Sequence, residues 1–266
     1  MKLLKWITGS SLGGNPELET LRSIRPLLLE AHGLIKAEEH GKSREILLRA
    51  LEVRDHINSA ETVDWMLTSL ASTWISQEKF DDQAGFFSDY INRHPGDASA
   101  YCCRAMALWY SGRLKEAAED YSRAIELQPA DLLSRSGRGQ VLAELGDQHA
   151  ATRDLEMALR LLTDTSKLNE EWIRWCRDAE AFVRRGRAVA LAGSGQIREA
   201  MNEFDRSATL NPNNAWVYYS RARVYDRLGD GERALADYTS SLEKNDPRLT
   251  PLQRTLARER ADALRR

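Results

Sequence analysis

Residues 98–131 read ASAYCCRAMALWYSGRLKEAAEDYSRAIELQPAD, and residues 132–165 repeat the same pattern as LLSRSGRGQVLAELGDQHAATRDLEMALRLLTDT. The two stretches share a glycine at one position, Gly112 and Gly146, and the same separation recurs between Gly195 and Gly229. The separation between Gly146 and Gly195 is longer, and a single insertion, placed at 166–180, restores the period. A fixed period of about 34 residues predicts a repeat protein built from copies of one supersecondary unit.

The spacing of side chains within each unit predicts two helices. In the first half, Tyr101, Ala105 and Leu108 follow one another at steps of four and three, which places them on one helical face. In the second half a small residue lets the two helices approach closely, and a glycine between the helices supplies the left-handed cap. Proline ends the second helix at Pro129. The small residues at equivalent positions are Ala105, Gly139, Ala188 and Ala222 in the first helices and Ala117, Ala151, Ala200 and Ala234 in the second.

With its Tyr, Gly/Ala, Ala, Phe/Tyr and Pro positions, this unit resembles the tetratricopeptide repeat family. The resemblance implies an all-α fold, a right-handed α-solenoid of about five to six stacked helix-turn-helix hairpins with a C-terminal capping helix. The unit at 64–97 departs from the pattern, because Glu78 replaces the glycine and Gln83 the alanine. The expected organisation is a flexible arm at 1–15 and a solenoid over 16–266, made of a degenerate hairpin at 17–60 (amphipathic stretches Leu28–His40 and Ser43–Asp55), repeats at 64–97, 98–131 and 132–165, an insertion at 166–180, repeats at 181–214 and 215–248, and a capping helix at 250–265.

Composition and motifs exclude several classes of function. The chain has 38 Lys and Arg against 40 Asp and Glu, a formal net charge of −2, which disfavours a nucleic-acid binder because no excess of cations is present. No phosphate-binding glycine loop, His-Glu-x-x-His or Cys-x-x-Cys motif occurs, so the sequence predicts no catalytic, cofactor-binding or metal site and no enzyme. The three cysteines form no disulfide pattern, and no apolar run is long enough for an integral membrane segment, so we expect a cytoplasmic protein.

An arginine recurs at one position of the first helix, and a carboxylate follows it at a constant separation in the second. This separation can return the chain across a hairpin, so we expect ion pairs that join helices within or between repeats. The alternative is a ladder of arginines that binds phosphates or acidic peptides. The arginines are Arg104, Arg138, Arg187 and Arg221, and the carboxylates are Asp120, Asp154, Glu203 and Asp237.

The first helices of this family line a concave groove that commonly holds a partner. Placing the inner face on this sequence gives a surface that is apolar towards its amino-terminal half and rich in aromatic residues and arginine towards the carboxyl end. An alternative for Trp109 and Phe182 is packing against the neighbouring repeat. The expected partner-binding residues are Trp65, Trp109, Tyr110, Gln140, Trp172, Trp175, Phe182, Arg185, Trp216, Tyr219, Arg223 and Arg227.

The insertion at 166–180 contains two tryptophans, Trp172 and Trp175, and lacks proline and glycine. It is expected to lengthen the following helix by two or three turns, with Asn169 or an earlier Ser or Thr as the cap. The tryptophans then share one face. Two interpretations stay open: burial against the preceding repeat, or a protruding contact for a partner or for self-association with a second copy.

Together these features favour a non-catalytic scaffold or adaptor that holds a protein or peptide in the concave groove. One form of this hypothesis makes the protein a subunit of a larger complex. The alternative is a peptide-sensing regulator whose solenoid changes curvature when a ligand binds. The arm at 1–15 is either inert or a short contact for a partner or membrane surface. The resemblance to the repeat family predicts the architecture of the chain, but it does not predict which partner the chain binds.

Overall fold

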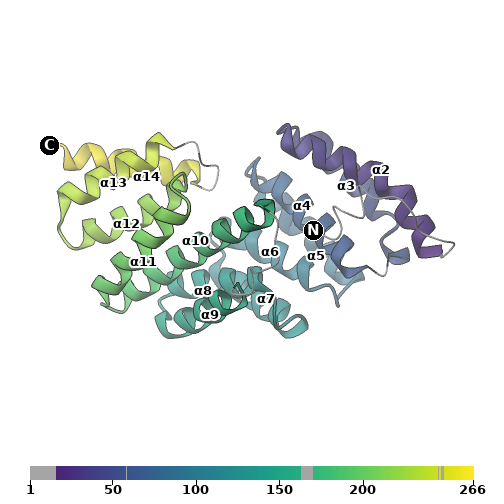
Figure 1. Ribbon diagram of the computed structural model, residues 1–266, viewed down its shortest axis with the longest axis horizontal. Coiled ribbons are helices and arrows are strands. Elements are labelled where there is room, and N and C mark those ends of the chain that lie inside the picture. Colours follow the sequence, from purple (N-terminus) through teal and green to yellow (C-terminus); the bar gives the residue numbers. More distant parts are fainter. Residues whose placement is uncertain (1–15, 58, 163–169, 245, 247–248) are drawn as a thin grey trace. The chain divides into compact units, whose positions relative to one another are not determined.

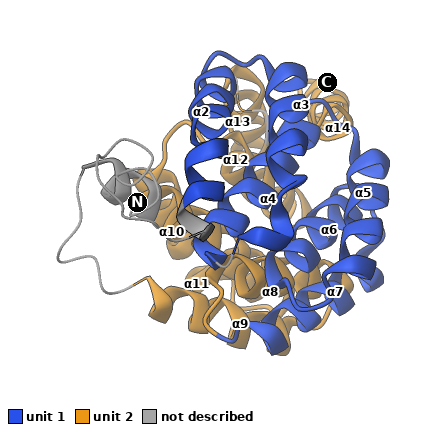
Figure 2. Cartoon of the chain, turned by 90° about the vertical axis from the view of Figure 1, so that its right-hand side faces the viewer, with its two compact units in different colours: residues 1–129 blue, residues 130–266 orange. Residues whose placement is uncertain are grey.

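The computed structural model describes residues 16–57, 59–162, 170–244, 246 and 249–266. Regular structure in these ranges is helical, with no strand among them, which confirms the all-α solenoid class. The chain divides into two compact units, residues 1–129 and 130–266 (Figure 2), where the sequence leads us to expect one continuous solenoid. Each repeat of a solenoid contacts only its neighbours, so a division can fall between any two repeats. Here it falls directly after Pro129.

Unit 1 is a stack of helical hairpins, and the first five α-helices that the structure describes share an apolar core. Fully buried side chains from successive helices form this core, among them Leu28, Leu47, Leu70 and Phe87. In chain order (Figure 1) the hairpins are α2 (Pro16–Lys36) with α3 (His40–Leu51), α4 (Ala60–Ile75) with α5 (Phe80–Arg93), and α6 (Ala98–Tyr110) with α7 (Leu114–Leu127), and a 3-10 turn η1 (Arg54–His56) follows α3.

The hairpin formed by α4 and α5 accommodates its two departures from the repeat pattern, Glu78 and Gln83, in different ways. Glu78 adopts the left-handed conformation that glycine takes in the later turns, with φ of 56° against 81° at Gly112. Gln83, at the alanine position, is buried, and its amide Nε2 donates a hydrogen bond of 2.7 Å to the carbonyl of Cys103 in α6. The repeat therefore forms despite both substitutions, with a strained backbone at Glu78.

Unit 2 continues the pattern of hairpins and ends in a single helix. The close approach of its first hairpin depends on Gly139, because a Cβ atom there would lie 2.7 Å from Leu155 Cγ and 3.1 Å from the carbonyl of Ala151. This confirms the expected role of the small residue. The helices (Figure 1) are α8 (Leu132–Leu145) with α9 (Gln148–Leu161), α10 (Glu170–Gly193) with α11 (Ile197–Leu210), α12 (Ala215–Arg227) with α13 (Gly231–Glu243), and α14 (Pro251–Leu264).

The insertion lengthens α10, as expected. Helix α10 has 24 residues, whereas α8 has 14. It begins at Glu170, well before Ala181, the first residue of the expected repeat, an extension of about 16 Å at 1.5 Å per residue. Asp178 in the extension accepts a hydrogen bond of 2.7 Å from Nδ2 of Asn211. Asn169 and the side chains of residues 170–176, which include Trp172 and Trp175, lie outside the described part of the chain, as does the arm at 1–15.

All four expected ion pairs form within their hairpins. Three are bidentate, because the guanidinium Nε and Nη2 atoms reach both oxygens of an aspartate at 2.6–2.8 Å: Arg104 with Asp120, Arg138 with Asp154, and Arg221 with Asp237. The fourth joins Arg187 Nη1 to Glu203 at 3.1 Å. These pairs confirm the ion-pair interpretation, and they raise the pKa of Arg104 and Arg221.

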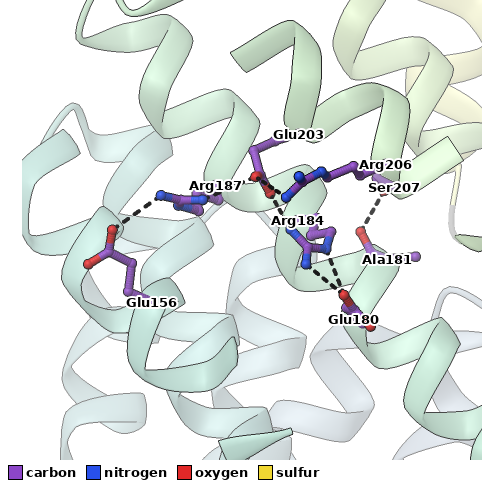
Figure 3. A network of polar contacts seen from close by, with 8 residues as sticks. All are labelled: Glu156, Glu180, Ala181, Arg184, Arg187, Glu203, Arg206 and Ser207. Atoms are coloured by element: carbon purple, nitrogen blue, oxygen red, sulfur yellow. Dashed lines mark hydrogen bonds and ion pairs between the residues drawn. The ribbon is translucent and has the colours of Figure 1, made fainter. Parts of the chain in front are cut away.

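The glutamate in the fourth pair serves several arginines (Figure 3). Glu203 is 4% exposed and also accepts a hydrogen bond of 2.9 Å from Arg184, whose guanidinium binds Glu180 in the same helix. Arg206 lies 3.8 Å away. The longer glutamate side chain therefore contacts arginines of both α10 and α11. The aspartate at the equivalent position of each other hairpin binds mainly one arginine.

Helix α14 has a capped start, and an ion pair joins it to the last hairpin. Thr250 and Gln253 form a reciprocal capping box at its start. Arg260 binds Asp226 of α12 through two contacts of 2.5 and 2.8 Å, and this pairing lowers the pKa of Asp226. Ala257 and Ala261 are buried, so α14 covers the end of the stack with its small residues.

Candidate partner-binding site

The expected binding residues of unit 2 gather on consecutive first helices. Phe182 and Arg185 of α10 recur one repeat later as Trp216 and Tyr219 of α12, so they occupy the same face of neighbouring hairpins. We define the α10–α12 surface by six residues that this face carries. They are Phe182, Arg185, Trp216, Tyr219, Arg223 and Arg227.

One end of the α10–α12 surface is a packed cluster of a cation and two rings. The Arg185 guanidinium carbon lies 3.7 Å from the centre of the Trp216 ring and 5.8 Å from that of Phe182, and the two rings are 5.9 Å apart. Arg185 also donates a hydrogen bond of 3.1 Å from Nη1 to the hydroxyl of Ser220. Stacking on an aromatic face suits the planar guanidinium and holds the cluster in one arrangement.

The six residues of the α10–α12 surface differ in how far they are exposed to solvent. Arg185, Trp216 and Tyr219 are 4%, 4% and 5% exposed, and Phe182 is half-buried. Arg223 and Arg227, further along α12, are exposed. The buried side chains therefore shape the surface from beneath, and the exposed arginines form its accessible end.

Tyr219 connects the two ends of the surface. The guanidinium carbon of Arg223 lies 5.8 Å from the centre of its ring, and the Tyr238 ring of α13 packs against its edge at 6.1 Å. Burial raises the pKa of the Tyr219 hydroxyl, Arg223 opposes this shift, and Glu144 of α8 adds to it. Glu144 therefore acts electrostatically on the same part of unit 2.

Gln140, Trp172 and Trp175 are the remaining residues of unit 2 that the sequence predicts to bind a partner. Gln140 is 2% exposed, and its Cγ atom would lie 2.5 Å from a Cβ placed on Gly186 of α10. It packs between α8 and α10, so its expected contact with a partner stays a prediction. The expected contact of Trp172 and Trp175 with a partner also stays a prediction, because their side chains lie outside the described part of the chain.

In unit 1 the expected residues form two separate aromatic contacts. Trp109 is 7% exposed and stacks on Tyr110 at 5.6 Å, and Tyr110 stacks on Phe80 of α5 at 5.4 Å. Trp65 is half-buried, 6.3 Å from the ring of His32 in α2. Trp109 is therefore buried and Tyr110 remains partly accessible, and contact of either residue with a partner stays a prediction.

Sequence reasoning missed the roles of three residues that complete these groups. Ser220 binds Arg185, Phe80 continues the aromatic stack, and Glu144 shifts the pKa of Tyr219. Ser220 occupies the repeat position that Gly186 holds in α10, so the repeat gave its position but not its role. The repeat likewise places Glu144 on the inner face without indicating its role, and no pattern in the sequence marks Phe80.

Two features are absent from the described part of the chain. None of its helices combines the length and the apolar character needed to cross a membrane. Nor does it contain a group of three or more His, Cys, Asp or Glu side chains placed to hold a metal ion.

Comparison with known proteins supports the same architecture. A tetratricopeptide repeat model matches residues 98–131, and a second model of that description matches residues 203–236. Human "Tetratricopeptide repeat protein 6" is 26% identical over 140 residues, which are 53% of this chain and 24% of that protein. The "DnaJ homolog subfamily C member 7 homolog" of Schizosaccharomyces pombe is 22% identical over 229 residues, 82% of this chain and 45% of that protein. The chain thus spans from about a quarter to about half the length of these relatives.

A solved structure extends the likeness over most of the chain. A tetratricopeptide repeat protein from Parabacteroides merdae matches with a TM-score of 0.56 at 18% identity, covering 91% of each chain. Stacked helical hairpins with a fixed period define an α-solenoid. The chain is a tetratricopeptide repeat protein.

Proposed function

We propose that this protein is a non-catalytic interaction scaffold that holds a peptide or protein partner along the inner face of its first helices. A protein-interaction scaffold is the general function that the repeat family and fold support. The observation that carries the finer proposal is the α10–α12 surface, where a packed Arg185–Trp216 cluster adjoins two exposed arginines. Aromatic residues and arginine dominate the energetics of protein interfaces, and a rigid cluster reduces the entropy lost on binding.

Photo-crosslinking tests the choice of face. Leu133 of α8 occupies the repeat position that Phe182 holds in α10, and it is 40% exposed. Met157 of α9 is 38% exposed and lies on a second helix, which makes it a matched control. A photoreactive side chain at position 133 of the full chain is expected to capture the partner, and one at position 157 is not. Capture from position 157 alone would show that the binding face is wrong.

Affinity purification with mass spectrometry tests the α10–α12 surface itself. Replacing Tyr219, Arg223 and Arg227 with alanine should remove the partner, but Tyr219 is buried and its loss leaves a cavity. The double variant Arg223→Ala with Arg227→Ala is therefore the cleaner test, because both side chains are exposed. Recovery of the same partners in undiminished amounts would contradict the assignment.

The regulator alternative differs in one measurable consequence. If the bound peptide changes the curvature of the solenoid, small-angle scattering of the full chain will show a changed radius of gyration at saturation. A scaffold with a fixed inner face will show none.

The extension of α10 is proposed as a second contact surface, through Trp172 and Trp175. Its length beyond the hairpin supports this role, because about three helical turns precede the first residue of the repeat. Replacing both tryptophans with alanine distinguishes the two interpretations left open by the sequence. Lower thermal stability indicates burial, whereas lost self-association or partner binding at unchanged stability indicates an interface.

A further inference from the structure

We propose that a cavity between α5 and α7 of unit 1 is a binding site for a phosphate group, with Arg104 and Arg113 as its cationic residues. The cavity has a volume of about 220 Å³, and most of its lining belongs to second helices. The inference therefore goes beyond the proposed function, which concerns the inner face of the first helices. The polar residues that line the cavity are Ser88, Arg104, Arg113, Glu116, Glu119 and Asp120.

The equivalent arginines of unit 2 show what this place in a hairpin holds. Arg221 binds Asp237 of its own hairpin at 2.7 and 2.8 Å, and its Nη1 atom also binds Asp205 of the preceding hairpin at 2.5 Å. Arg187 likewise reaches Glu156 of the preceding hairpin at 3.3 Å, besides the glutamate of its own. In unit 2 each guanidinium at this repeat position therefore binds two carboxylates, one from each hairpin.

Unit 1 has a serine in place of the second carboxylate. Ser88 stands at the repeat position of Glu156 and Asp205, and its hydroxyl accepts a hydrogen bond of 3.2 Å from Nη1 of Arg104. Within the described ranges Arg104 forms an ion pair with one carboxylate, where Arg221 has two. Because the serine is neutral and shorter than an acid, the cavity beside it leaves room for an external anion at the place of the missing carboxylate.

A second cation distinguishes this cavity from the equivalent places in unit 2. Arg113 stands at a repeat position that is occupied there by Asp147, Gln196 and Asp230. It pairs with Glu116 at 2.8 and 2.5 Å, and it is exposed at the edge of the cavity. Two substitutions, acid to serine and acid or amide to arginine, therefore make the same cavity more favourable for an anion.

The carboxylates of the lining limit the affinity. Asp120 and Glu116 are compensated, because they pair with Arg104 and Arg113. Glu119 is exposed and opposes an anion. We therefore expect a dissociation constant on the order of 1 mM for inorganic phosphate.

A phosphate group suits this lining better than a carboxylate does. Its oxygens can accept charge-assisted hydrogen bonds from both guanidinium groups, and its second negative charge strengthens the attraction to each. The Ser88 hydroxyl can donate as well as accept, so it can turn towards the same oxygens. The guanidinium groups of Arg104 and Arg113 line one cavity, which lets a single ligand contact both.

Isothermal titration calorimetry of the full chain at constant ionic strength tests the proposal. The probes are inorganic phosphate for a free anion and glycerol 3-phosphate for a phosphate ester, with acetate as a singly charged carboxylate. Either phosphate should bind, and the tighter of the two identifies the form of the ligand. Acetate should bind about fivefold more weakly or less. The heat of binding is measured instead of Tm, because phosphate also stabilises folded proteins without occupying a site.

Variants assign the binding to named residues. Ser88→Asp supplies the acid found in unit 2, so it should raise the Tm and weaken phosphate binding about tenfold or more, whereas Ser88→Ala should keep most of the affinity. Arg113→Ala should weaken binding about three- to tenfold, and Glu119→Gln should tighten it about twofold. The matched control is Arg123→Ala, which removes an exposed arginine paired with Glu126 in the same helix and should leave the affinity unchanged.

Several results would overturn the inference. It is wrong if neither phosphate binds the wild-type chain, if acetate binds as tightly as phosphate, or if Arg123→Ala weakens binding as much as Arg113→Ala. Phosphate binding by a folded Ser88→Asp variant at the wild-type affinity would also contradict it. If Ser88→Asp does not fold, the comparison of Arg113→Ala with Arg123→Ala decides. The proposed function is tested separately, because these probes involve no peptide or protein partner.

Discussion

Arg187 of α10 reaches back to Glu156 of α9, 31 residues earlier in the chain, with Nη2 3.3 Å from Oε1 (Figure 3). Arg221 makes the same backward contact to Asp205 over 16 residues, and Arg104 reaches Ser88 over 16. The longer separation at Arg187 exceeds the other two by the length of the insertion at 166–180. The inserted residues therefore leave the contact between successive hairpins intact.

The repeat arginines should contribute more to stability than arginines in ordinary surface pairs. Arg104→Ala leaves the buried Asp120 carboxylate without its bidentate partner, which should cost about 1–3 kcal/mol in the free energy of unfolding. Arg113→Ala removes an exposed pair with Glu116 in the same hairpin and should change stability little. Urea unfolding of both variants measures the difference. Equal effects would mean that the Arg104 pair is no more than a surface contact.

Glu78→Gly should stabilise the protein. Glu78 has φ of 56°, a conformation that costs an L-residue about 1 kcal/mol and costs glycine almost nothing. The control is Glu52→Gly, where φ is −59° and glycine offers no relief. Thermal unfolding should show a higher Tm for Glu78→Gly and a lower or unchanged Tm for Glu52→Gly. The prediction fails if both variants are destabilised to the same extent.

Two glycine-to-alanine changes should have opposite effects. A Cβ at Gly139 meets Leu155 at 2.7 Å and the backbone carbonyl of Ala151 at 3.1 Å, so Gly139→Ala should lose about 1–3 kcal/mol of stability. Gly85 of α5 has no atom within 4 Å of such a Cβ, and Gly85→Ala should gain about 0.5–1 kcal/mol through higher helix propensity. Chemical denaturation measures both. A loss at Gly85 as large as that at Gly139 would contradict the close-approach argument.

Attachment of α14 should depend on pH in the acid range. The pairing with Arg260 holds the pKa of Asp226 below its ordinary value of 3.8. A carboxylate with a lowered pKa stabilises the fold above its unfolded value, and this contribution is lost as the pH falls through the folded value. The Tm difference between wild type and Arg260→Ala should therefore be present near neutral pH and shrink below about pH 4. A difference that is constant down to about pH 2.5 would rule out the linkage.

The sequence predicted much of the fold because the repeat makes each position visible several times. Gly139, the Arg221–Asp237 pair and the lengthening of α10 could all be derived from spacing. The hairpin was expected at 17–60, which agrees with its start at Pro16, but the full length of its first helix could not be derived, since the amphipathic stretch was expected only from Leu28. Pro26 inside that helix removes a backbone donor and obscures the pattern.

The binding surface was predicted less completely than the fold. Its residues were placed on one face by the repeat period, but burial depends on the neighbouring helix, which the period does not describe. Arg185 illustrates this, because stacking on Trp216 buries a residue expected to face a partner. The division after Pro129 has no counterpart in the spacing either.

Because the guanidinium groups of Arg187 and Arg221 each satisfy acids in two hairpins, loss of one hairpin leaves a charged group of its neighbour without part of its coordination. In a one-dimensional Ising description this raises the coupling between adjacent repeats relative to their intrinsic stabilities. Unit 2 should then unfold as a cooperative block instead of fraying repeat by repeat. Native-state hydrogen exchange would show this as one shared opening free energy across α10 to α13.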